Sequence, residues 1–237
     1  MNGSTPEAGA WRSLARAAWI AFATHLAAGI AMALVLRHGL DTNRDIDDRL
    51  RFIDEHRAAW IAGWIAWNVA ALAFLGFVAT FRRAHEAAGT ARSRVGRLAV
   101  LAAVAGVALD LAAESIEMAA LPSLARRALG APGSHSEFLA AHRAAVLMTG
   151  FAANGLYTLA VLLLLAACRG IARAQRSAGA AVVAAGVAVS LASLAHSVAG
   201  MFWSNAILVP LLLVWLALVA RDAAARARAA TSVRVQS

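Results

Sequence analysis

Residues 98–121 read LAVLAAVAGVALDLAAESIEMAAL, an apolar run interrupted by Asp110, Glu114 and Glu117. The hydrocarbon core of a bilayer is about 30 Å thick and needs about 20 helical residues to cross it, so this run is long enough to span. A charge near the centre of a membrane helix costs roughly 2.5 to 3.5 kcal/mol, so the three carboxyl groups must face protein or water. The run therefore predicts a buried face on a membrane helix and marks these acids as the leading site candidates.

Five further segments have the length and apolar character of a span. The predicted spans run from Ala17 to Leu36, Ala58 to Phe81, Leu98 to Leu121, Ala144 to Cys168, Ala180 to Ala199 and Phe202 to Ala220. The hydrophobic content of 61% and mean hydropathy of +0.67 exceed those of ordinary soluble chains, in which apolar residues make up nearer half. We expect an all-α polytopic membrane protein, with one six-helix domain over residues 1–221 and a flexible basic cytoplasmic tail over residues 222–237.

The arginines predict how the chain is oriented. Fourteen of the 22 basic residues, all of them arginine, fall on one side if both termini are cytoplasmic, and basic residues favour the cytoplasmic side. In a soluble protein the net charge of +9 would suggest nucleic acid, but here short arginine clusters between spans account for it. We therefore expect a lipid bilayer and no nucleic acid as partner. Such chains are typical of a cell membrane, and specifically of the bacterial inner membrane.

Two patterns lie outside the acidic segment. Ile46, Leu50 and Ile53 recur at helical spacing in the loop at 37–57, which indicates an amphipathic segment at the outer surface. The segment from Phe52 to Ala59 also resembles that from Phe138 to Ala145, at an offset of 86 residues that superposes His56-Arg57 on His142-Arg143. A duplicated hairpin of helices 2–3 and 4–5 and a shared membrane-interface motif both account for this match.

The three acids share one face of the third predicted helix. At 100° per residue Asp110, Glu114 and Glu117 lie within about 60° of one another, and together they form an acid ladder along the helix. Repulsion and desolvation both disfavour three charged carboxylates, so the ladder should hold either a proton or a cation. The alternative is a purely structural role, in which the acids pair with arginines such as Arg57, Arg126, Arg127 or Arg143.

Other polar residues in the predicted spans are candidate ligands. They are His196 near the outer end of helix 5, Asn68 in helix 2, and Asn154 and Tyr157 in helix 4. Carboxylates together with an imidazole suit manganese, iron or zinc, yet no Glu-x-x-His or His-Glu-x-x-His spacing occurs. The two histidines His25 and His196 are a weak signal for paired haem ligands. Hydrogen bonding between helices explains the asparagines equally well. The cofactor stays open, and Cys168, the only cysteine, excludes an intramolecular disulfide.

Three functions fit these residues. The leading hypothesis is an ion-coupled transporter in which Asp110 and Glu114 bind a proton or cation, while Glu117 and His196 form the outer gate or relay. The second is a membrane-embedded enzyme, metal-dependent or not, acting on a lipid or quinone-like substrate. The third is a structural or regulatory subunit whose acids pair with a partner's arginines. The sequence contains no phosphate-binding glycine loop and no Gly-x-Ser-x-Gly motif, and it leaves the oligomeric state open.

Overall fold

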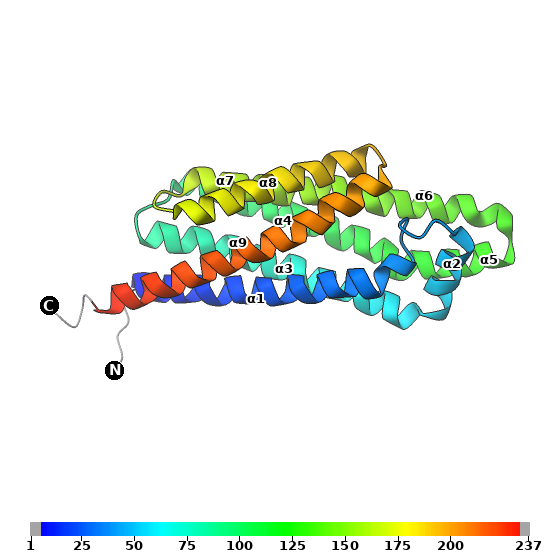
Figure 1. Cartoon of the computed structure of the whole chain (residues 1–237), viewed down its shortest axis with the longest axis horizontal. Coiled ribbons are helices and arrows are strands. Elements are labelled where there is room, and N and C mark those ends of the chain that lie inside the picture. Colours follow the sequence, from blue (N-terminus) through cyan, green and yellow to red (C-terminus); the bar gives the residue numbers. More distant parts are fainter. Residues whose placement is uncertain (1–5, 233–237) are drawn as a thin grey trace.

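The structure is a computed structural model that describes residues 6–232, and in that range six helical spans are long and apolar enough to cross a membrane (Figure 1). The long helices are α1 (Pro6–Leu34), α3 (Arg57–Ala87), α4 (Ser93–Ser115), α7 (Asn154–Ala167), α8 (Arg173–Leu194) and α9 (Val198–Ser232). The shorter elements are η1 (Leu36–His38), α2 (Ile46–Glu55), η2 (Ile116–Ala120), α5 (Leu121–Gly130), η3 (Pro132–Ser134), α6 (His135–Val146) and η4 (Leu147–Ala153). The described chain is thus all-helical and polytopic, as predicted.

Two of the six spans contain a π-helical segment. The third span is continuous from Ser93 to Gly130 and includes η2, and the fourth is continuous from His135 to Ala167 and includes η4. A π-helix adds a residue to the turn and changes the direction of the side chains that follow it, and such segments are frequent at functional sites. Both segments lie where the acid ladder faces its neighbours.

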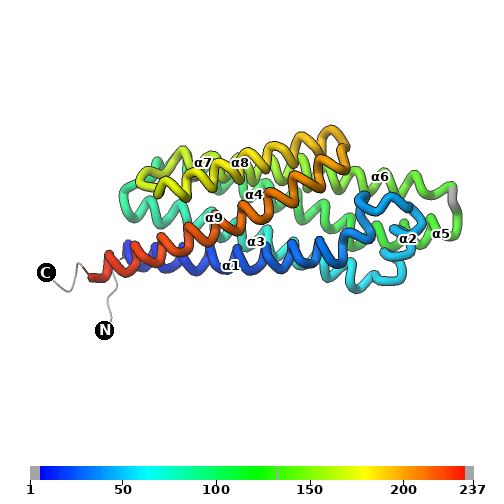
Figure 2. The backbone as a smooth tube through the Cα atoms, in the orientation of Figure 1, coloured from blue at the N-terminus to red at the C-terminus, as the bar shows by residue number. Residues whose placement is uncertain are grey.

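The two ends of the bundle differ. The ends of α1 and α9 that lead to the chain termini lie together at one end, while α2, α5 and α6 project beyond α1, α8 and α9 at the opposite end (Figure 1). The tube in Figure 2 shows the same arrangement, with α9 crossing over α1 and α3 behind them. The packing of α1 is most extensive against α9 and α3. The short helices α2, α5 and α6 are therefore gathered at one end of the bundle, which we call the α2–α5 end.

Two apolar clusters hold the helices together. The larger one lies along the bundle around the fully buried Trp11, Phe77 and Trp215, and the smaller one lies at the α2–α5 end. The predicted amphipathic segment forms α2, and its Leu50 and Ile53 are completely buried in the smaller cluster. The apolar face of α2 is thus covered by protein. Large aliphatic side chains elsewhere on the long helices point outward, as a lipid-facing surface requires.

The boundary between the last two spans differs from the prediction. Helix α8 ends at Leu194 rather than Ala199, and α9 begins at Val198. The backbone of His196 adopts a φ of 51°, and Ser197 Oγ accepts the backbone N–H of Gly200 at 3.2 Å, in the manner of a helix N-cap. His196 therefore lies in a turn, not in a helix. At the other end of α9 the helix continues through residues 222–232 of the predicted tail, and residues 233–237 lie outside the described range.

Candidate functional site

The acid ladder is buried inside the protein. The exposed fractions are 6% for Asp110, 2% for Glu114 and 2% for Glu117. The first two lie on α4 and the third on η2, which contact α6, α7 and η4. The three side chains are thus directed toward neighbouring helices and shielded from lipid.

Asp110 is held by hydroxyl groups from the fourth span. Thr149 on η4 donates its hydroxyl to one carboxylate oxygen, and Tyr157 on α7 donates to the other at 3.2 Å. Gly106, one turn before Asp110, makes room for the tyrosine, because a Cβ at this position would lie 2.7 Å from the ring. Asp110 thus has two neutral hydrogen-bond donors and no ion pair among the described residues.

Glu117 belongs to a chain of charged side chains that leads out of the bundle. Its Oε1 lies 3.0 Å from Nδ1 of His142 on α6, and the other ring nitrogen, Nε2, lies 3.4 Å from Oδ2 of Asp41. Asp41 Oδ1 in turn pairs with Nη1 of Arg49 at 2.6 Å. Only the imidazolium form of His142 has an N–H for each of its two carboxylate neighbours. We name this chain, Glu117–His142–Asp41–Arg49, the relay.

The outer members of the relay lie outside the membrane-spanning helices. Burial tends to raise the pKa of Asp41, but its contact with His142 and the attraction of Arg49 outweigh burial and lower the pKa to about 2. Arg49, on α2, also donates from Nε to the carbonyl of Gly39 at 3.2 Å and lies over the ring of Phe138. The relay is therefore fixed in place from α2, α6 and η2 together.

Glu114 has no partner of this kind. Its Oε2 is buried and makes no hydrogen bond with the described residues, and no described arginine or histidine forms an ion pair with it. Its charged neighbours are Asp110 and Glu117, both of the same sign. In the relay, Arg49 and His142 contact the carboxyl groups of Asp41 and Glu117. Glu114 is therefore a buried acid that, unlike Asp110, has no hydrogen-bond donor in the described protein and, unlike Glu117, has no ion pair there.

The backbone around η2 is also tied to its neighbours. Trp60 on α3 is completely buried and donates its indole N–H to the backbone carbonyl of Glu117 at 2.8 Å. This bond connects α3 to the π-helical segment η2. It fixes the position from which Glu117 reaches His142.

The remaining predicted site residues lie apart from the ladder, except for Tyr157. Asn154 donates to the carbonyl of Gly186 at 2.7 Å and to the hydroxyl of Ser190 at 2.8 Å, and so joins α7 to α8. Asn68 is half-buried, and its Oδ1 makes no hydrogen bond with the described residues. His196 is exposed in its turn and does not pair with Glu117, whose partner is His142.

The predicted arginine partners are used elsewhere or are unpaired. Arg126 pairs with Asp54 at 2.9 Å and Arg127 with Glu137 at 3.3 Å, both toward the surface. In the described part of the chain none of the ion pairs joins Arg57 or Arg143 to the ladder. Over the same residues no group of three or more His, Cys, Asp and Glu side chains is placed to hold a metal ion.

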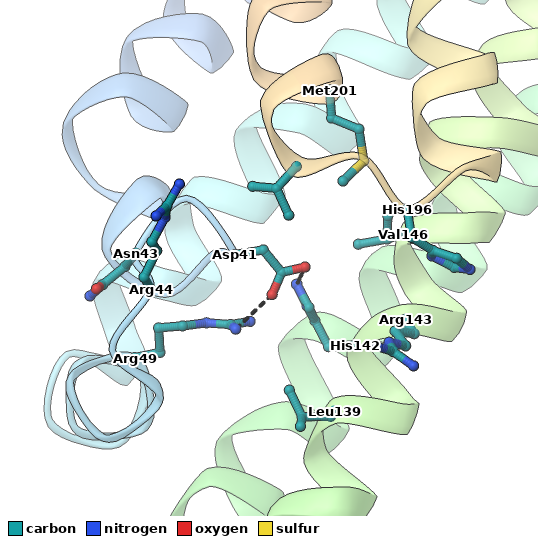
Figure 3. A pocket seen from close by; sticks show the side chains of 11 residues that line it. Asp41, Asn43, Arg44, Arg49, Leu139, His142, Arg143, Val146, His196 and Met201 are labelled. Atoms are coloured by element: carbon teal, nitrogen blue, oxygen red, sulfur yellow. Dashed lines mark ion pairs between the residues drawn. The ribbon is translucent and has the colours of Figure 1, made fainter.

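A cavity of about 290 Å³ opens at the α2–α5 end, and we call it the loop pocket (Figure 3). Figure 3 shows Asp41 in its centre, with ion pairs to Arg49 on one side and to His142 on the other. The described lining residues are Asp41, Asn43, Arg44, Arg49, Leu139, His142, Arg143, Val146, His196, Val198 and Met201. Because Asp41 and His142 line the pocket and His142 contacts Glu117, the relay connects the pocket to the buried ladder.

Sequence reasoning missed four members of this site: Asp41, Arg49, His142 and Thr149. Three of them lie in segments predicted to be outside the spans, and their partners are distant in the chain, so no local spacing reveals the contacts. His142 carried a signal, because its His-Arg pair repeats that of His56 and Arg57. In comparisons with known proteins, no family model, no curated protein and no solved structure matches this chain.

Proposed function

We propose that this protein binds and releases a proton at Glu114 and Asp110 inside the helix bundle and works as a small transporter that moves protons across the membrane. The observation that carries the proposal is the state of Glu114, which is 2% exposed and whose Oε2 has no described partner. Removing one carboxylate from water costs several kcal/mol unless it is paired, and a bound proton removes this cost. We therefore assign the bound proton to the carboxyl group of Glu114.

The relay supplies a path between this position and water. A proton at the loop pocket meets Asp41 and His142, and His142 contacts Glu117 at 3.0 Å. From Glu117 the ladder continues to Glu114 three residues earlier and to Asp110 four residues before that. Side chains at these spacings are neighbours on a helix, about 5 to 6 Å apart between Cβ atoms. Each step therefore joins adjacent titratable groups.

The charge of the pocket favours a proton over a metal cation. Arg44, Arg49 and Arg143 line it and repel an approaching metal cation, whereas a proton can be passed between neighbouring titratable side chains. The hydroxyl donors at Asp110 also fit a carboxyl group that alternates between charged and neutral forms. We place the protein in the cell membrane, in a bacterium the inner membrane, with both termini cytoplasmic and the loop pocket outside.

The experiment is proton uptake into liposomes that contain the purified protein, driven by an imposed membrane potential and followed with an internal pH dye. We expect Glu114→Gln and Asp110→Asn to reduce uptake to the level of empty liposomes. The matched control is Glu55→Gln, because Glu55 is an exposed acid outside the relay. Circular dichroism and size-exclusion chromatography establish that each variant still folds.

A second readout detects proton binding without transport. Infrared difference spectra between high and low pH should show the C=O stretching band of a buried protonated carboxyl group, and this band should disappear in Glu114→Gln but not in Glu55→Gln. Unchanged uptake and an unchanged band in Glu114→Gln would reject the proposal. A lost band with unchanged uptake would reject transport through the ladder and leave proton binding in place.

A further inference from the structure

The loop pocket is electropositive and its cationic groups are not all used. Of the described residues that line it, Arg44, Arg49 and Arg143 are arginines, whereas Asp41 is the one acid. Asp41 already pairs with Arg49 and His142. The exposed side chains of Arg44 and Arg143 have no ion pair or hydrogen bond within the described chain. The pocket thus holds more positive charge than the protein itself neutralises.

A donor of Arg49, one of the residues that line the pocket, also lacks a partner. Arg49 is 5% exposed, its Nη1 pairs with Asp41 and its Nε donates to Gly39, but its Nη2 is buried without a hydrogen bond to the described protein. A buried guanidinium N–H without an acceptor costs free energy, so Arg49 has donor capacity that the described protein does not use. The guanidinium group of Arg49 thus adds to the unmatched positive charge around the pocket.

We propose that the loop pocket is a binding site for a small oxyanion, a phosphate or carboxylate group, held between Arg49 and the guanidinium groups of Arg44 and Arg143. Guanidinium groups bind these planar or tetrahedral oxyanions through paired N–H donors. The volume of about 290 Å³ is at the low end for ligand cavities, so it fits a small ion or the headgroup of a lipid. This site goes beyond the proposed proton binding and does not depend on it.

The geometry of Figure 3 explains how the ligand would be held. The pocket is lined from one side by Arg44 of the loop and Arg49 of α2. It is lined from the other side by His142 and Arg143 of α6 and by His196 in the turn before α9. An anion between them would bridge segments that are far apart in the chain. The apolar side chains of Leu139, Val146 and Met201 also line the pocket.

The experiment measures anion binding directly. Inorganic phosphate and acetate are titrated by calorimetry into protein in nanodiscs of zwitterionic phosphatidylcholine, and binding of phosphatidylglycerol is measured by native mass spectrometry from nanodiscs that contain it. The test variant is Arg44→Ala with Arg143→Ala. The matched control is Arg37→Ala with Arg57→Ala, which removes the same charge from exposed arginines outside the pocket.

We expect the test pair to weaken binding by about tenfold or more and the control pair to leave it nearly unchanged. Binding of phosphate or acetate identifies a free oxyanion as ligand, and binding of phosphatidylglycerol alone identifies a lipid headgroup. The proposal is overturned if none of the three probes binds, or if the control pair weakens binding as much as the test pair. Glu114→Gln should keep anion binding, so failure of the proton proposal can be told apart from failure of this one.

Discussion

Replacing Asp41 by Asn is expected to loosen the contact between the loop, α2 and α6 by about 1 to 2 kcal/mol. The carboxylate has a pKa of about 2 instead of the ordinary 3.8, which corresponds to at most about 2.4 kcal/mol of stabilisation. Because 28% of the side chain is exposed, solvent screening reduces that limit. The substitution leaves Arg49 and His142 without their shared partner.

The effect of Asp41 should also depend on pH. A carboxyl group whose pKa is lowered by folding stabilises the folded state above its unfolded pKa of about 3.8. This contribution is lost as the pH falls from about 4 toward 2, where the folded group takes up its proton. In the wild type, the exchange rate of the α2 amides, divided by the intrinsic exchange rate at the same pH, should therefore rise as the pH falls over this range. The Asp41→Asn variant should show no such additional change.

The assay is amide hydrogen exchange of α2 in detergent or nanodiscs, read by mass spectrometry. A loss of 1 to 2 kcal/mol lowers the protection of these amides by about five- to thirtyfold. Asp48→Asn is the control, because Asp48 pairs with Arg51 at the same distance of 2.6 Å but with both side chains more than half exposed. Equal loss of protection in the two variants, or none in Asp41→Asn, would refute the reasoning from burial.

Three further predictions concern packing and reactivity. Gly106→Ala should destabilise the fold by about 1 to 3 kcal/mol, because its Cβ would displace Tyr157, while Gly76→Ala, with nothing within 4 Å, should have little effect; equal melting temperatures would contradict this. Trp60→Phe should lower stability by about 0.5 to 1.5 kcal/mol through loss of its hydrogen bond, measured by thermal unfolding. Burial raises the pKa of Cys168 to about 12, so iodoacetamide at pH 8 should label only unfolded protein, and rapid labelling of the folded form would disprove it.

The fold could be predicted from the sequence, because long apolar runs separated by arginine clusters are compatible with few structures other than a bundle of membrane-spanning helices. The amphipathic spacing of Leu50 and Ile53 also predicted α2 as a segment at the outer surface, but not the burial of its apolar face within the protein. The end of α8 was misplaced because alanine and serine continue smoothly through the boundary in hydropathy. The signal for this boundary is local, namely the hydroxyl of Ser197, which caps the start of α9.

The site was only partly accessible. Helical periodicity placed Asp110, Glu114 and Glu117 on one face, and that face is buried. Their partners could not be predicted in the same way, since His142 lies 25 residues from Glu117 and Asp41 much farther, in a loop. The two π-helical segments also change which side chains meet. A regular helical periodicity of 100° per residue does not predict such segments.

The pairing of α1 with α9 has a consequence for biosynthesis. Among the six described spans, the one translated first has one of its two largest contact surfaces on the one translated last. Until translation of α9 is complete, α1 can settle only against α3, and the rest of its inner face must be covered by lipid or by the insertion machinery. Nascent chains that stop before Val198 should therefore be recognised as unfinished and degraded, whatever the state of their first five spans.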